Sequence, residues 1–135
     1  MAKYIMWMEK NVILDYSEEE FEIAEWLENT FGGKIYMLPR VNIPEGIKTA
    51  DYLFDGEYWD LKKIFGNGKH CIDSSIKKKC NQAHNFIIDI SESKISYNQA
   101  LNQIKRIYEN KDRTWINRII LKDSGNVTII TRKKD

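Results

Sequence analysis

The dipeptide Asp55-Gly56 is the feature that most constrains how this 135-residue chain can fold. Asp-Gly is a preferred pair for the two-residue turn of a β-hairpin, because both central residues of that turn need a positive φ. Strand-forming residues flank the pair on both sides, in the stretch ADYLFDGEYWDLKK at 50–63. The sequence therefore predicts a β-hairpin over residues 51–64.

The register of this hairpin decides which side chains share a face. A two-residue loop pairs 54 with 57, 53 with 58, 52 with 59 and 51 with 60, and opposed side chains project to the same side, about 4.5–5.5 Å apart. We therefore expect Asp51 and Asp60 on one face, with Lys62 beside them through strand alternation. The opposite face collects a predicted core layer, which consists of Tyr52, Phe54, Trp59 and Leu61.

Two opposed carboxylates repel each other, so a cation or a shared proton is expected between them. Mg²⁺ is commonly held by one or two carboxylates, with water and substrate phosphate completing its shell. Such an ion can activate water and stabilise charge on a phosphodiester oxygen, while Lys62, kept charged by the acids, would neutralise the phosphate. These residues favour phosphodiester hydrolysis. The structural alternative is a surface ion-pair cluster in which Lys62 bridges Asp51 and Asp60.

The rest of the chain predicts an α/β fold with a mixed central sheet flanked by helices. Capping boxes at Ser17/Glu20 and Ser96/Gln99 open two helices, which end at Gly32-Gly33 and near Tyr108. Further expected elements are a strand at 34–38, a loop or irregular strand at 39–50, a short helix at 73–84 capped by Asp73, a buried strand at 85–90, and two strands around the turn at 124–126. We expect one domain over 1–135, with residues 1–16 poorly defined.

Composition narrows the class of protein. A hydrophobic content of 42% and a charged content of 30% are ordinary for a globular domain, and a net charge of +1 gives no overall attraction to nucleic acid. No apolar run approaches the roughly 20 residues that span a bilayer, so no membrane partner is expected. Cys71 and Cys80 lack metal-site or redox spacing, which favours reduced thiols in a reducing compartment such as the cytoplasm. Neither His70 nor His84 has a partner at metal-binding spacing, so both are expected to be structural or solvent-facing.

The stretch ADYLFDGEYWDLK resembles the PD-(D/E)xK motif of the restriction-endonuclease-like nuclease superfamily, in which an acid begins one strand and (D/E)-x-K lies on the next. The predicted element order also matches the α-β-β-β-α-β core of that superfamily. Ala50 stands where the motif usually has proline, a residue that shapes the backbone and does no chemistry. Within the superfamily, residues 22–62 look similar to C-terminal tRNase toxin domains of contact-dependent inhibition systems and to related domains on phage and polymorphic toxin proteins.

This resemblance implies that Asp51 and Asp60 bind Mg²⁺ or Mn²⁺ and that Lys62 is the catalytic lysine. The family often adds a glutamate from the first helix. Glu22 is favoured for that catalytic role, with Glu20 and Glu25 as alternatives.

Lysines between 62 and 79 outnumber acids and could hold a nucleic-acid backbone, since phosphate contacts supply most of the affinity. A solvated helix face would explain the same charges. In the superfamily, the helix after the D-x-K strand often offers polar residues to the site. The candidates for substrate binding are Lys63, Ser74, Lys77 and Gln82.

The resemblance implies a metal-dependent endonuclease that cleaves tRNA in preference to DNA. It also implies a toxin domain of a secreted or delivered protein that acts in the cytoplasm. A cognate immunity protein would then exist, in its expected form an acidic partner covering the lysine cluster. Two alternatives remain open: a DNA endonuclease of phage or mobile-element origin, and a non-catalytic nucleic-acid-binding or interaction module.

Overall fold

The computed structural model describes residues 4–6, 12–13, 18–37, 40–41, 50–79 and 83–132. The chain divides into two compact units, the first made of Met1–Asp60 and Asn81–Ala83 and the second of Leu61–Cys80 and His84–Asp135. The boundary falls inside strand β6 (Glu57–Lys63), so both units contain part of this strand.

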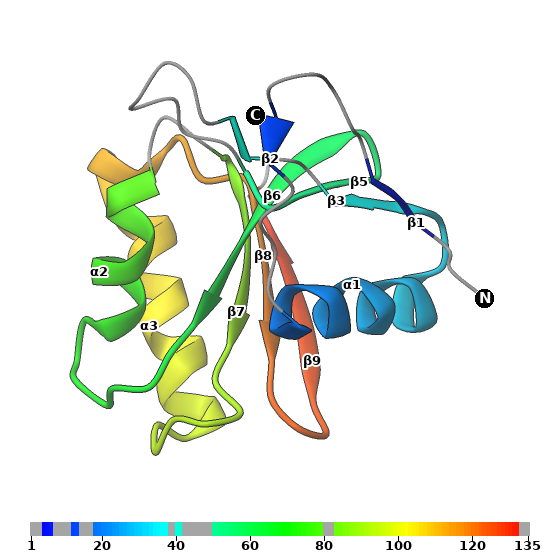
Figure 1. Cartoon of the computed structure of the whole chain (residues 1–135). Helices are drawn as coiled ribbons and strands as arrows, with labels where there is room; N and C mark the ends of the chain where they lie inside the picture. The colour runs from blue at the N-terminus through cyan, green and yellow to red at the C-terminus, as the bar shows by residue number, and fades with distance from the viewer. Residues whose placement is uncertain are drawn as a thin grey trace. The chain divides into compact units, whose positions relative to one another are not determined.

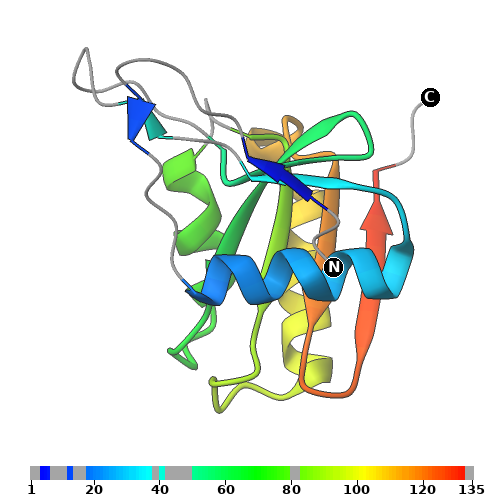
Figure 2. The ribbon, with the colours of Figure 1, turned by 45° about the vertical axis from the view of Figure 1, so that its right-hand side comes forward.

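The first unit is built on a mixed sheet. Its strands follow the order β1 (Tyr4–Met6), β3 (Ile35–Met37), β5 (Tyr52–Phe54) and β6. β1 runs parallel to β3, whereas the β3–β5 and β5–β6 pairs are antiparallel. A separate antiparallel pair joins β2 (Val12–Ile13) to β4 (Arg40–Val41). Helix α1 (Glu18–Phe31) lies beside β3 (Figure 2).

Helix α1 forms where the sequence predicts it. Its buried residues are spaced to form one stripe: Ile23, Ala24, Leu27 and Glu28. Gly32 ends the helix by donating its N–H to the Glu28 carbonyl at 2.9 Å, and both Gly32 and Gly33 have positive φ angles of 76° and 83°. Ser17, the expected first residue of the capping box, lies outside the described residues.

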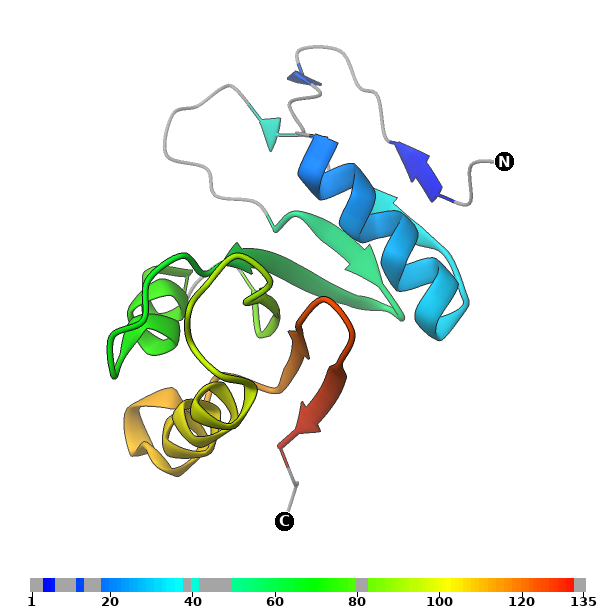
Figure 3. The same ribbon diagram turned by 90° about the horizontal axis from the view of Figure 1, so that it is seen from below.

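The second unit continues β6 into a sheet of the order β6, β7 (Asn85–Asp89), β8 (Arg118–Lys122) and β9 (Val127–Thr131). β7 and β8 are parallel, and β9 is antiparallel to β8. All five residues of β7 are buried, as the sequence predicts for a core strand. Helix α2 (Cys71–Ile76), the 3-10 turn η1 (Lys77–Lys79), helix α3 (Tyr97–Glu109) and the 3-10 turn η2 (Lys111–Arg113) complete the unit. α2 and α3 lie side by side (Figures 1 and 3).

The capping box of α3 is confirmed. The Ser96 hydroxyl accepts the Gln99 N–H at 3.1 Å, and the Gln99 side chain accepts the Ser96 N–H at 3.0 Å. Two donors at the helix start are thereby satisfied. The buried stripe of this helix contains Ala100, Gln103, Ile104 and Ile107.

The predicted helix at 73–84 is wrong in its bounds and in its cap. α2 begins at Cys71 with His70 in the N-cap position, and its last turn tightens into η1. Asp73 lies inside the helix, where its carboxylate accepts two hydrogen bonds from the Arg113 guanidinium, at 2.7 and 3.2 Å. This distant cation explains the acid better than a local capping role.

The expected fold class, a mixed α/β domain with helices beside a mixed sheet, is confirmed. A single nuclease domain over 1–135 stays a prediction. No helix in the described ranges combines the length and the apolar character needed to cross a membrane.

Candidate active site

The Asp55-Gly56 turn has the backbone that the sequence predicts. Asp55 has a φ of 55° and Gly56 a φ of 73°, and two positive values define the type I′ turn of a tight hairpin. The strands pair in the expected register, 52 with 59, 53 with 58 and 54 with 57.

The ladder ends one pair earlier than expected, which corrects the prediction that Asp51 pairs directly with Asp60. The Asp51 N–H donates to the Trp59 carbonyl at 3.0 Å, although Trp59 is already the partner of Tyr52. Asp51 and Tyr52 thus both lie opposite Trp59, which is the arrangement of a β-bulge. A bulge changes the direction of a side chain, so Asp51 is aimed by backbone geometry and not by simple alternation.

The apolar face of the hairpin is confirmed as core. Tyr52 and Trp59 are fully buried and Phe54 is 7% exposed, whereas Leu61 is half-buried. The Phe54 ring contacts Phe31 of α1 and Trp59 of β6, with ring centroids 6.3 and 6.1 Å apart. The Trp59 indole N–H donates to the Phe54 carbonyl at 3.0 Å. This packing holds the hairpin against α1.

Of the predicted site residues that the structure describes, Asp60 is the most deeply buried. Its side chain is 1% exposed, although charged side chains are rarely buried without compensation. Asp51 is half-buried. The site therefore combines one enclosed carboxylate with one that solvent can reach.

Tyr52 connects these acids to helix α1. Its hydroxyl donates to the main-chain carbonyl of Glu20 at 2.6 Å. Burial raises the pKa of Tyr52 well above the usual range of a phenol, and the charges of Asp51, Glu20 and Asp60 raise that pKa further.

Exposure and position on α1 distinguish Glu20 from Glu22. Glu20 is half-buried and lies on the stripe that contains Ala24 and Leu27, whereas Glu22 and Glu25 are exposed. Residues two positions apart lie about 200° apart around a helix, so Glu20 and Glu22 point in nearly opposite directions. The assignment of Glu22 remains a prediction.

The donor set suits a hard cation with an incomplete protein shell. Among the residues that the structure describes, no three His, Cys, Asp or Glu side chains are grouped closely enough to hold a metal ion. A closed cage of three carboxylates is therefore absent from that part of the chain. Mg²⁺ does not need one, because it usually keeps several waters and takes only one or two carboxylates from the protein. Asp51 and Asp60 fit that requirement.

The predicted cationic residues belong to the second unit. Lys62 is half-buried and lies two residues after Asp60, on the same face of β6. Lys63 is half-buried at the end of that strand, while Lys77 in η1 and Ser74 in α2 are exposed. Gln82, the remaining predicted substrate contact, lies outside the described residues. The structure thus places half-buried Glu20 in the turn of α1 that Tyr52 contacts, and it leaves Lys77 and Ser74 exposed in the second unit.

Sequence reasoning missed Tyr52, which it placed only in the core. No local signal could show that this phenol reaches Glu20, 32 positions earlier in the chain.

Comparison with known proteins identifies the family. The sequence model of the contact-dependent growth inhibition CdiA C-terminal domain matches residues 48–127, which is more than half of the chain. A search of curated proteins gave no match. Among solved structures, a chain of the CdiA-CT/CdiI toxin and immunity complex from Burkholderia pseudomallei is similar, with a TM-score of 0.66 and 24% sequence identity over 85% of this chain and 83% of that one. That likeness shows a shared fold. The family match extends from before the hairpin to the start of β9, and the chain therefore belongs to the family of contact-dependent growth inhibition CdiA C-terminal domains.

Proposed function

We propose that this domain is a metal-dependent endonuclease of the PD-(D/E)xK type that acts as a toxin, with tRNA as its preferred substrate over DNA. The observation that carries the proposal is one tight hairpin that presents half-buried Asp51, buried Asp60 and, two residues further along β6, Lys62. An inhibitory domain needs a reaction that disables a cell, and hydrolysis of a phosphodiester by an acid pair followed by a lysine is such a reaction.

Asp51 and Asp60 would hold Mg²⁺ or Mn²⁺. The ion, when bound, supplies Lewis-acid stabilisation of phosphodiester charge and lowers the pKa of an attacking water. Burial fixes the Asp60 carboxylate, since packed neighbours limit its rotamers, whereas half-buried Asp51 leaves the opposite side open to substrate.

Tyr52 and Lys62 have supporting roles in this scheme. The Tyr52 hydroxyl ties the first turn of α1, at the main-chain carbonyl of Glu20, to β5. The Lys62 ammonium carries the positive charge needed to stabilise the extra negative charge that develops on a phosphate under attack.

The family membership supports a delivered toxin that acts in the cytoplasm of the cell it enters. The similar solved structure is described as a toxin and immunity complex, and we extend this pairing to the present chain. A cognate immunity protein with an acidic surface would suit the exposed lysines Lys77 and Lys78.

The proposal is tested by offering labelled tRNA and duplex DNA together to the purified chain with Mg²⁺, with Mn²⁺ or with EDTA. We expect tRNA cleavage that needs the metal and that is lost in Asp60→Asn and Lys62→Gln. Asp55→Asn is the matched control, because it removes an exposed acid from the same hairpin and asparagine suits a positive φ.

Each of the other possible outcomes of this assay would contradict the proposal. Cleavage of DNA alone would identify a DNA endonuclease, and cleavage that survives EDTA would reject the metal mechanism. Retention of tRNA without cleavage of either substrate would identify a binding module.

A further inference from the structure

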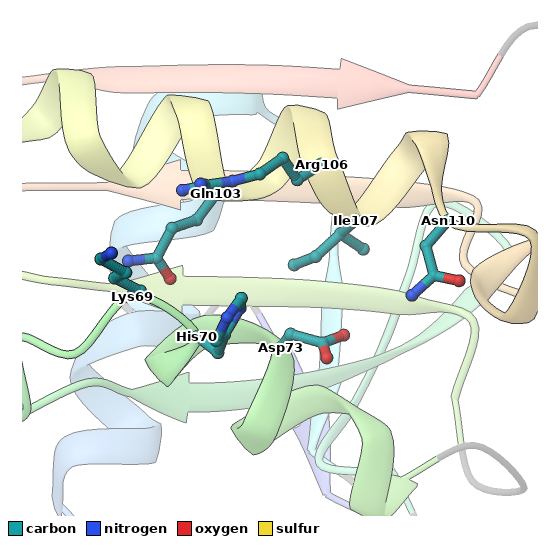
Figure 4. A pocket seen from close by; sticks show the side chains of 7 residues that line it. All are labelled: Lys69, His70, Asp73, Gln103, Arg106, Ile107 and Asn110. Carbon is teal, nitrogen blue, oxygen red and sulfur yellow. The ribbon is translucent and has the colours of Figure 1, made fainter.

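A pocket lies entirely within the second unit, between helices α2 and α3 (Figure 4). Its volume is about 120 Å³. Lys69, His70 and Asp73 line it from the α2 side, Gln103, Arg106 and Ile107 line it from α3, and Asn110 lines it from the residue after α3.

The floor of this pocket is fixed by Gln103, which is 5% exposed. Its amide N–H donates to the Gly68 carbonyl at 2.9 Å. Its amide oxygen accepts the Ile72 N–H at 3.3 Å and the Cys71 thiol at 3.6 Å. These bonds attach the turn that carries Lys69 and His70 to helix α3. The pocket is therefore formed in advance of any ligand.

The charge that faces this pocket is positive. Arg113 neutralises the one carboxylate in the lining, Asp73, through a two-bonded ion pair. Lys69, His70 and Arg106 are exposed, and within the described part of the chain their side chains make no hydrogen bond or ion pair. Cations from two different elements thus converge on one hollow with their donors available.

We infer that this pocket binds a backbone phosphate of the nucleic-acid substrate, an inference that rests on the proposed nuclease function. Arg, Lys and Asn donors are the groups that most often contact nucleic-acid phosphates. Pockets for drug-sized ligands have volumes of roughly 300–1,000 Å³, so this smaller hollow suits one anionic group and not a whole nucleotide. The guanidinium of Arg106 can bind such a group through two parallel N–H donors.

The test measures RNA binding without cleavage. In an Asp60→Asn background, the affinity for fluorescently labelled tRNA is measured by anisotropy over a range of KCl concentrations. The variants are Lys69→Gln, Arg106→Gln and the double variant. The matched controls are Lys105→Gln, which neighbours Arg106 on α3 but does not line the pocket, and Lys94→Gln in the preceding loop.

Each pocket substitution should weaken tRNA binding about three- to fivefold. The double variant should also reduce the slope of log K against log [KCl] by about 0.7–0.9, the value for one lost phosphate contact, and each single substitution should reduce it by less. Both controls should stay within about twofold of the background protein.

Equal affinities and slopes for pocket and control variants would overturn the inference. Two further measurements test whether the pocket binds an anion other than an RNA phosphate. If inorganic phosphate shifts the amide signals of residues 69 and 106 while tRNA binding ignores the substitutions, the pocket is a small-anion site and the inference fails. It also fails if labelled polyglutamate, but not tRNA, loses affinity, because that result indicates a carboxylate-bearing protein partner.

Failure of this inference can be told apart from failure of the proposed function. Wild-type cleavage of tRNA with unchanged binding in the pocket variants would reject the pocket alone. A wild-type chain that cuts nothing, but whose pocket variants lose tRNA affinity, would reject the nuclease and keep the phosphate site.

Discussion

Replacing Asp60 by asparagine separates the role of this residue in metal binding from its role in the fold. The two side chains have nearly the same shape, so the substitution removes a charge without opening a cavity in a place that is 1% exposed. If Asp60 is a metal ligand, the variant should lose both tRNA cleavage and the stabilisation that the metal gives to the folded protein.

The size of this stabilisation follows from mass action. With about 10 mM free Mg²⁺ and a dissociation constant on the order of 1 mM, a ligand that binds only the folded state adds about 1.4 kcal/mol to the free energy of unfolding. For a chain of 135 residues, an unfolding entropy of about 2.1 cal/mol/K per residue converts that energy into a rise in Tm of about 5 °C. Asp60→Asn should reduce this rise to about 1 °C or less.

The assay is a thermal melt of wild type, Asp60→Asn and Asp55→Asn, each with 10 mM MgCl₂ and with EDTA at matched ionic strength. The quantity compared is the shift in Tm that Mg²⁺ causes, so any change in the stability of the metal-free variant cancels. Asp55→Asn should keep the full shift. A full shift in Asp60→Asn would refute the assignment of this carboxylate as a ligand. The absence of a shift in wild type at any Mg²⁺ or Mn²⁺ concentration up to 10 mM would refute the metal site itself.

Three further predictions follow from the geometry. Glu20→Gln should lower the rate of tRNA cleavage at least about tenfold, whereas Glu22→Gln on the exposed face of α1 should stay near wild type; equal rates would reject the assignment of Glu20. Arg113→Gln should lower the free energy of unfolding in urea by about 1–3 kcal/mol, because the partly buried Asp73 carboxylate loses a two-bonded partner, and no loss would show that this pair is merely superficial. Burial raises the pKa of Tyr108 to about 12, so this group favours the folded state fully below pH 10 and loses that contribution as the pH rises through about 12. Between pH 9 and pH 11 we expect the free energy of unfolding to fall by about 1 kcal/mol, a value discounted for solvent exposure. Urea titrations at the two pH values measure this fall, and Tyr108→Phe should abolish it.

The parts of the fold that the sequence predicts correctly depend on interactions between near neighbours. The Asp55-Gly56 turn sets the hairpin register through two positive φ angles in adjacent residues. The capping box of α3 joins residues three positions apart. Local chemistry decides such elements before any tertiary contact forms, so residue type and spacing were enough to predict them.

The details of the sites depend instead on contacts between distant residues. The Asp73–Arg113 ion pair joins positions 40 apart, and the Gln103–Gly68 hydrogen bond joins positions 35 apart. Asp73 looked like a helix cap because aspartate is common in that role. A cation supplied by another element has no counterpart in the local pattern, so the expected cap was wrong for a physical reason.

The choice between Glu20 and Glu22 depends both on the local sequence pattern and on a contact between distant residues. The period of α1 places Glu20 with Ala24 and Leu27, whereas its expected part in a capping box gives it a structural role at the helix start. The Tyr52 hydroxyl now attaches the main chain of Glu20 to the hairpin, and the charge of Glu20 acts on the phenol together with those of Asp51 and Asp60. Tyr52 is also the last residue of the β5 ladder, and the bulge at Asp51 comes immediately before it. Tyr52→Phe would remove the hydroxyl but keep the ring packing. If the variant stays folded at the assay temperature but cleaves tRNA more slowly than wild type, the Tyr52 hydrogen bond organises the acids. An unchanged cleavage rate would show that the bond only supports the core.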